Sequence, residues 1–294
     1  MTIKTQRLLD RAKKIAKKGD HEEAQKLYET VLEDSPNNQE AKSGLIALQQ
    51  GKDQRSPPKA EIQSVIALYS NGQIPEALDA IETLIKDFPK EPLLYNISGA
   101  CYKAIGQLDD AAKSFEKAVT LKPDYAEAQY NLGIVFMDLN QLDAALNCYK
   151  KALAIKPDYA EAHNNLGATL EALQQLDGAI KSYERALAIK PDYAEAHNNL
   201  GVTLKELGQL DAAFKRFKKA VTLKPDYADA YANLGGVLLD LKRMDEALIS
   251  YERAIALDPD IDFILGFLLH TKMHLCIWDD LANRLGELTN KINN

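Results

Sequence analysis

Apolar residues recur at helical spacing along most of the chain, in short amphipathic runs that turn residues interrupt. The first two runs occupy residues 5–36. Leu8 and Ala12 share one helical face, Gly19 marks the break between the runs, and Pro36 ends the second one. This pattern predicts a helical hairpin at the start of the chain.

The stretch 51–58 has the composition of a linker, because it combines one glycine with two prolines and contains no apolar residue. Residues 39–49, just before it, predict one more amphipathic helix. We therefore expect an N-terminal segment over 1–50, made of a hairpin and one extra helix, followed by a linker or bend at 51–58.

From residue 59 onward the pattern repeats with a period of 34 residues, and the motif Lys-Pro-Asp-Tyr-Ala returns at 122–126, 156–160, 190–194 and 224–228. A fixed period of this length indicates stacked helix pairs. We expect six units over 59–261, each with a helix A and a helix B of roughly 13 residues. Proline ends each helix B, because it lacks an N–H and clashes with the preceding turn.

A glycine stands at the same place in five successive A helices, although glycine costs about 0.5–1 kcal/mol there relative to alanine. The pattern predicts close helix packing, with the alanine twelve residues later in helix B as the partner. The glycines are Gly99, Gly133, Gly167, Gly201 and Gly235, and the alanines are Ala111, Ala145, Ala179, Ala213 and Ala247.

The aspartate after each proline is expected to cap the next helix A, since a Glu follows at capping-box spacing in Asp124–Glu127, Asp158–Glu161 and Asp192–Glu195. A second aspartate series opens helix B, where negative charge suits the positive end of the helix. That series is Asp109, Asp143, Asp177, Asp211 and Asp245.

This set of small and large residues on a 34-residue period resembles the tetratricopeptide repeat (TPR), over residues 58–261 and less completely over 5–38. The resemblance implies an all-α protein, a right-handed superhelical solenoid of stacked antiparallel helix pairs. In such a solenoid the A helices form a concave inner face. Almost all the repeated residues are then core, so function must come from positions that packing does not explain.

Four asparagines meet that condition: Asn131, Asn165, Asn199 and Asn233 lie two residues before the helix A glycine. Asparagine is a poor residue inside a helix. Neighbouring helices pack about 8–10 Å apart and an extended peptide advances about 3.3 Å per residue, so one amide would meet roughly every third peptide residue. We expect this asparagine ladder, with the adjacent Asn164 and Asn198, to bind a peptide backbone. The alternatives are amides bonded to neighbouring helices and simple duplication of a repeat.

Asparagine in this slot is similar to the TPR region of the O-linked N-acetylglucosamine (O-GlcNAc) transferase family. In that family these asparagines hold extended substrate peptides. The stretch with Cys276, Trp278 and Asp280 resembles the junction that precedes the catalytic domain in bacterial members. A catalytic domain would need several hundred further residues, and the sequence stops at Asn294. We therefore expect this chain not to be an enzyme, and to need no cofactor.

The composition, 46% hydrophobic and 27% charged, is that of a soluble globular protein. A net charge of −7 argues against nucleic acid as the main ligand. No apolar stretch reaches the roughly 18 residues of a membrane span, and the N-terminus does not read as a signal peptide. Cys101, Cys148 and Cys276 have no zinc or disulfide spacing. We expect a cytoplasmic protein without nucleic-acid or membrane partners.

Other residue pairs have weaker claims to function. His270 and His274 are one helical turn apart with Cys276 nearby, but a metal site needs a third clear ligand, so we expect none. His163 and His197 fill the first large-residue slot of helix A and are expected to be structural.

Two features of the groove bear on the kind of partner. The TPR clamp that grips a terminal carboxylate needs basic residues in slots that hold Asn164, Asn198 and Ala232 here, so that partner class is not expected. Four acidic residues could favour basic peptides, although such charges usually form a solvated face. They are Asp138, Glu171, Glu206 and Asp240.

The segment 262–294 is too apolar to stand free. It is expected to form capping helices over the open end of the stack, and it could also serve as a docking or homo-oligomer surface. Three functions follow from the sequence: a scaffold that binds extended peptides, the substrate-recruiting part of a glycosyltransferase, and a self-associating assembly protein.

Overall fold

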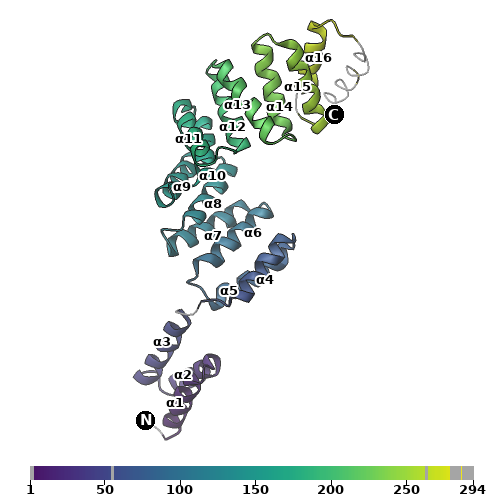
Figure 1. The fold of residues 1–294 in the computed structure, drawn as a ribbon. Coiled ribbons are helices and arrows are strands. Elements are labelled where there is room, and N and C mark those ends of the chain that lie inside the picture. Colours follow the sequence, from purple (N-terminus) through teal and green to yellow (C-terminus); the bar gives the residue numbers. More distant parts are fainter. Residues whose placement is uncertain (1–2, 54–55, 262–263, 279–285, 287–294) are drawn as a thin grey trace. The chain divides into compact units, whose positions relative to one another are not determined.

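A computed structural model describes residues 3–53, 56–261, 264–278 and 286. Within these residues the regular structure is entirely helical, and the all-α prediction is confirmed. The chain divides into two compact units, Met1–Pro123 and Asp124–Asn294; the colours of Figure 1 follow the sequence from the first to the second.

The described residues of unit 1 form seven helices and contain two hydrophobic cores. One core joins α1, α2 and α3 around Leu9, Tyr28 and Val31, and the other joins α4, α5 and α6 around Ile81 and Leu94. The helices are α1 (Ile3–Lys17), α2 (His21–Asp34), α3 (Gln39–Asp53), α4 (Lys59–Ser70), α5 (Ile74–Asp87), α6 (Pro92–Ala104) and α7 (Leu108–Leu121).

The predicted extra helix after the first hairpin is α3, and it continues to Asp53. The first three residues of the predicted linker at 51–58 are therefore helical. The position of a domain break there stays a prediction.

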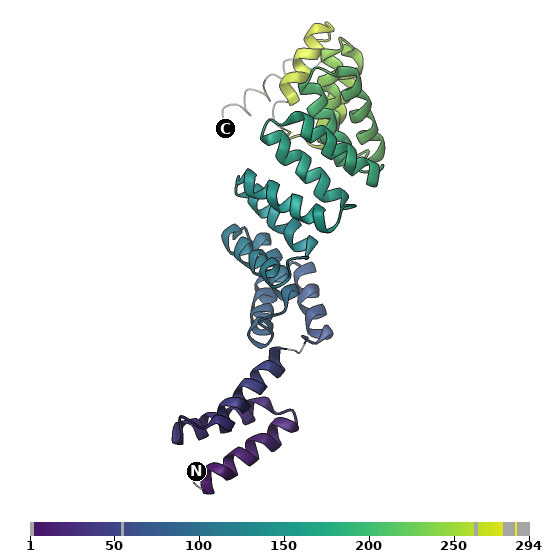
Figure 2. The same cartoon turned by 90° about the vertical axis from the view of Figure 1, so that its left-hand side faces the viewer.

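Unit 2 begins with four antiparallel helix pairs and contains the functional site described below. In each pair the A helix has 13 residues and the B helix 14, close to the predicted length. The A helices are α8 (Ala126–Asp138), α10 (Ala160–Ala172), α12 (Ala194–Glu206) and α14 (Ala228–Asp240). The B helices are α9 (Leu142–Ile155), α11 (Leu176–Ile189), α13 (Leu210–Leu223) and α15 (Met244–Leu257), and α16 (Ile264–His274) follows them. The turned view in Figure 2 shows the successive helices of this unit lying against one another.

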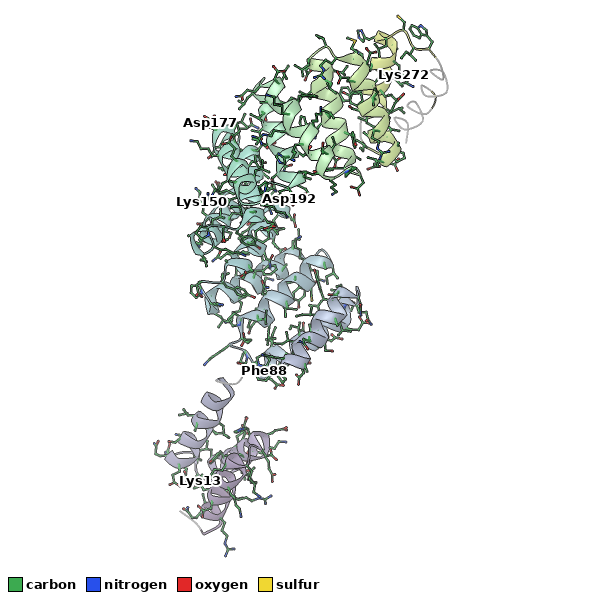
Figure 3. All side chains as sticks on the ribbon, in the orientation of Figure 1. Lys13, Phe88, Lys150, Asp177, Asp192 and Lys272 are labelled. Atoms are coloured by element: carbon green, nitrogen blue, oxygen red, sulfur yellow. The ribbon has the colours of Figure 1, made fainter. Side chains whose placement is uncertain are left out.

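The loop that enters each A helix is a tight turn. The prediction that its aspartate caps the helix is wrong. Before α10, the Tyr159 N–H donates to the Lys156 carbonyl at 3.3 Å, which leaves Asp158 inside the turn. The N-cap position belongs to Tyr159, which makes no side-chain capping bond. The Lys156 Nζ instead lies 4.4 Å from the centre of the Tyr159 ring. Asp192 has the same place in the turn before α12 (Figure 3).

The glycine in each A helix faces an aromatic ring rather than the predicted alanine. A Cβ on Gly167 would lie 2.6 Å from a ring carbon of Tyr183, which is sixteen residues later in α11. The same clash recurs between Gly201 and Phe217. Helix A therefore needs glycine because a flat ring of helix B lies against its backbone.

The turn from helix A to helix B uses a residue with positive φ. After α14, Lys242 has φ 62°. Its N–H donates to the Leu239 carbonyl and the Arg243 N–H donates to the Leu238 carbonyl, each at 2.9 Å. This is a Schellman ending, whose left-handed residue is usually glycine. Gly208 occupies the equivalent place after α12.

We expect Lys242→Gly to raise the free energy of unfolding by about 0.5–1 kcal/mol, because it removes the strain of a side chain at positive φ. Lys242 is exposed, so no packing is lost. Urea unfolding followed by circular dichroism measures the change, with Gly208→Lys as the reverse substitution. Equal stability of Lys242→Gly and the unchanged protein would contradict the expectation.

Helix α16 packs on the last pair of the stack. Ile264, Leu265, Leu268 and Leu269 are buried in the core that α15 also enters. Lys272, labelled in Figure 3, pairs with Glu252 of α15 at 3.3 Å.

The surface of this end keeps some apolar exposure. Phe267 and Trp278 are 51% and 58% exposed. The predicted homo-oligomer contact through the C-terminal segment stays a prediction, and Phe263 lies outside the described residues.

Candidate functional site on the A helices of unit 2

Side-chain amides form one continuous chain of hydrogen bonds across the four A helices of unit 2. The chain alternates bonds between adjacent residues of one helix with bonds between neighbouring A helices. Asn233 Nδ2 donates to Asn198 Oδ1 at 3.0 Å, Asn198 Nδ2 to Asn199 Oδ1 at 3.4 Å, Asn199 Nδ2 to Asn164 Oδ1 at 3.2 Å, Asn164 Nδ2 to Asn165 Oδ1 at 3.3 Å, and Asn165 Nδ2 to the Tyr130 hydroxyl at 3.2 Å. We call these six residues the amide chain.

The amide chain has an inner and an outer layer. Asn164 and Asn198 are each only 6% exposed, whereas Asn165, Asn199 and Asn233 are half-buried. An amide offers two N–H donors and two acceptor lone pairs, and the chain uses one of each on both Asn165 and Asn199. The outer amides therefore keep a second donor and a second acceptor outside the chain.

This arrangement differs from the predicted ladder, in which the side-chain amides were expected to be free to bind a peptide. The predicted ladder residues Asn165, Asn199 and Asn233 bond to neighbouring helices, and the adjacent asparagines act as the connecting inner layer. Asn131 is half-buried in α8, and the amide chain ends at Tyr130 of the same helix. Tyr130 was not predicted from the sequence, because a tyrosine beside the asparagine slot has no periodic counterpart.

A cavity of about 410 Å³ adjoins the amide chain at Asn199. Glu171 forms part of its lining. The Glu171 Oε2 atom accepts hydrogen bonds from the Tyr183 hydroxyl at 3.0 Å and from the Thr203 hydroxyl at 2.7 Å. Burial and the nearby Glu171 carboxylate raise the pKa of Tyr183, so its hydroxyl stays a donor. Glu206 contributes a second carboxylate to the lining. We call this space the Glu171 cavity.

A second cavity, of about 520 Å³, lies further along the same face. The amides of Asn198 and Asn233 line it together with Phe267 of α16. Its lining includes three charged side chains of α12 and α14, namely Lys205, Asp229 and Asp240, and Lys205 pairs with Asp240 at 3.4 Å. Two cavities therefore adjoin the amide chain, one beside Asn199 of α12 and one beside Asn198 of α12 and Asn233 of α14.

His163 and His197 each bond to a backbone carbonyl, which is consistent with the structural role expected from their slot. Their Nε2 atoms lie 3.0 and 3.1 Å from the carbonyl oxygens of Pro157 and Pro191. A carbonyl only accepts, so the neutral ring must carry its proton on Nε2. Burial lowers the pKa of both rings below 6.5, and the positive charge of Arg216 adds to the effect at His197.

Because the folded His197 holds a proton less readily than the unfolded chain does, its contribution to stability is complete above pH 6.5 and declines as the pH falls below that value. We expect His197→Gln to make the loss of stability on acidification smaller. Glutamine suits the slot, since Gln129 occupies it in α8 and is buried there. Urea unfolding at several pH values tests this, with the exposed His274→Gln as control. An unchanged pH dependence in His197→Gln would contradict it.

The remaining candidates do not assemble into a site. The Nε2 atoms of His270 and His274 are 3.1 Å apart, and Cys276 is exposed. In the described part of the chain, no three metal-ligating side chains come together. Asp280, part of the junction motif, lies outside the described residues. No described helix is both long enough and apolar enough to cross a bilayer.

Two family models match the repeated part of the chain. A model described as "TPR repeat" matches residues 99–140, 135–174 and 171–208, and one described as "Tetratricopeptide repeat" matches 194–260. Among curated proteins, the peroxisomal targeting signal receptor of Kluyveromyces lactis is 29% identical over 80 residues, which are 27% of this chain and 14% of the receptor. That of Candida albicans is 36% identical over 87 residues, covering 28% and 15%. The chain thus spans only a small part of these relatives.

Solved structures match a larger share of the chain. YrrB, described as a TPR protein with an unusual peptide-binding site, is 25% identical with a TM-score of 0.54, and the match covers 67% of this chain and 99% of YrrB. PilW, a type IV pilus biogenesis factor, is 25% identical with a TM-score of 0.65, covering 72% of this chain and 100% of PilW.

Proposed function

Because this chain belongs to the tetratricopeptide repeat family over residues 99–260, we propose that the A-helix face of unit 2 binds an extended polypeptide segment. The chain then acts as a non-catalytic scaffold for protein interaction. The bound segment lies along the amide chain, across α8, α10, α12 and α14.

The observation that carries this proposal is the hydrogen-bonding capacity that the outer amides keep beyond the amide chain, clearest at Asn199, which lines the Glu171 cavity. Asn165 and Asn199 each keep one donor and one acceptor beyond the bonds of the amide chain. A peptide backbone offers one acceptor and one donor per residue. The inner layer holds the outer amides in fixed orientations, so little side-chain freedom is lost when a peptide binds.

The relatives support the same kind of ligand. YrrB is described as having a peptide-binding site, and its match covers two thirds of this chain. The curated relatives are receptors for a targeting signal.

Random short peptides displayed on phage provide the test. After selection on the full chain, the best peptide is synthesised with a fluorescent label and its affinity is measured by polarisation. We expect Asn165→Ala/Asn199→Ala to weaken binding roughly 10–100-fold, since each lost hydrogen bond contributes about 0.5–1.5 kcal/mol.

The matched control is Asn147→Ala, which removes an exposed asparagine from the B helix α9 of the same unit. It should leave the affinity unchanged. Circular dichroism confirms that the double variant is folded. The proposal is lost if the folded double variant binds every selected peptide as tightly as the unchanged chain does.

A second candidate function is substrate recruitment for a glycosyltransferase of the O-GlcNAc type. Two observations favour it: asparagines share one slot in four A helices, and Cys276 and Trp278 follow α16 at the spacing of that family's junction. Sequencing the gene past codon 294 is the test. A reading frame that continues into a nucleotide-sugar domain supports this candidate, and a stop codon there counts against it.

A further inference from the structure

We propose that the Glu171 cavity takes the guanidinium group of an arginine in the polypeptide bound along the amide chain. This inference rests on the peptide-binding function proposed above and adds a side-chain preference to it. Three observations carry it: the charge of Glu171, the way its carboxylate is held, and the space beside it.

Glu171 is the only acidic residue at its position in the four A helices. The equivalent positions hold Met137 in α8, Lys205 in α12 and Leu239 in α14. Lys205 already has a partner, because its Nζ lies 3.4 Å from Asp240. The bonds of Glu171 come from two neutral hydroxyls, so within the described residues its negative charge has no ion-pair partner.

The Glu171 carboxylate is fixed by buried donors. Tyr183 and Thr203 are 1% and 0% exposed, and both donate to the same oxygen, Oε2. A carboxylate held on one oxygen presents the other in a defined place, and such preorganisation lowers the entropy lost on binding.

A purely structural role for Glu171 is not required by the stack. In the preceding pair, the buried Tyr149 hydroxyl makes no hydrogen bond to a carboxylate among the described residues. The Thr169 hydroxyl there meets the Met137 sulfur at 3.1 Å. In the following pair the aromatic residue is Phe217, which has no hydroxyl. The helices therefore pack in both neighbouring pairs without a carboxylate.

The space beside Glu171 suits a long cationic side chain. The cavity of about 410 Å³ has Glu206 as a second carboxylate and Asn199 of the amide chain in its lining. A guanidinium carries five donors in a planar fork and can bind two carboxylates at once. With Asn199 holding the backbone, an arginine side chain entering this cavity would meet both. A basic segment also complements the net charge of −7.

The test uses the peptides selected by phage display on the full chain. We expect arginine to be enriched at one fixed position of the selected set, and to lose this enrichment when selection is repeated on Glu171→Gln. Replacing that arginine by citrulline, which has nearly the same shape and no charge, should weaken binding about tenfold to the unchanged chain. It should have little effect on binding to Glu171→Gln.

Glutamine keeps an acceptor oxygen for Tyr183 and Thr203, and melting temperatures check that the fold is retained. Glu184→Gln is the matched control, because it removes an exposed carboxylate from the B helix α11. It should leave the citrulline effect intact. One outcome overturns the arginine inference and leaves the proposed function standing: the peptides lose affinity for Asn165→Ala/Asn199→Ala but bind the unchanged chain equally well with arginine or citrulline. Peptides indifferent to both asparagines overturn the proposed function itself.

Discussion

Gly201→Ala is expected to lower the free energy of unfolding by about 1–2 kcal/mol, although alanine is the better helix former. The new Cβ would lie 2.6 Å from a ring carbon of Phe217, which is fully buried. Overpacking of this kind costs about 1–3 kcal/mol, and the gain in helix propensity returns about 0.5–1 kcal/mol. The ring cannot move without disturbing the contact between α12 and α13, so the loss prevails.

The matched control is Gly266→Ala in α16, where a Cβ would meet no atom within 4 Å. That variant should gain stability from helix propensity alone. Urea unfolding of both variants beside the unchanged chain measures the two effects. If Gly201→Ala were as stable as Gly266→Ala, the ring of Phe217 would not be what requires a glycine in helix A.

The helix pairs of unit 2 could be predicted from the sequence because local rules determine them. Pro157 ends helix B and the 34-residue period sets the lengths of the helices, and the structure confirms both. The acidic residues at the start of helix B, such as Asp143 and Asp177, also lie in the first turn as predicted.

Contacts between helices were harder to predict, because they depend on side-chain direction as well as spacing. The period places both Ala179 and Tyr183 near Gly167, and only the packing of the pair shows that the ring covers the glycine. Asp158 was predicted as a cap from its spacing, yet the hydrogen bond that closes the turn shifts the N-cap to Tyr159.

The sequence predicted the helix positions that form the candidate site, but not which side chains there bond to one another. The slot of Asn165 and Asn199 was found from the sequence, because an amide inside a helix is unusual. Bonds from these amides to neighbouring helices were considered only as an alternative, and the partner was not foreseen because Asn199 reaches Asn164, the residue beside its periodic equivalent. From the sequence, Glu171 was only one of four acidic residues expected on the groove. Its bonds to Tyr183 and Thr203 join three different helices, so the sequence pattern could not single it out.

Asn198→Ala, in the inner layer of the amide chain, is expected to lower the free energy of unfolding by about 1–3 kcal/mol. Asn198 is 6% exposed, donates to Asn199 and accepts from Asn233. Its removal takes away two hydrogen bonds, each of which contributes about 0.5–1.5 kcal/mol. The bond to Asn233 also links α12 to α14, so hydrogen exchange should quicken in both helices.

Asn147→Ala, on the exposed surface of α9, controls for the intrinsic effect of replacing asparagine by alanine in a helix. It should be neutral or slightly stabilising, because alanine is the better helix former. The comparison separates the two layers of the amide chain. A large loss in Asn198→Ala means that the inner layer holds the helices together. A loss no larger than that of Asn147→Ala would mean that the inner bonds contribute little, and the outer amides would then lack the fixed orientation on which the proposed peptide site depends.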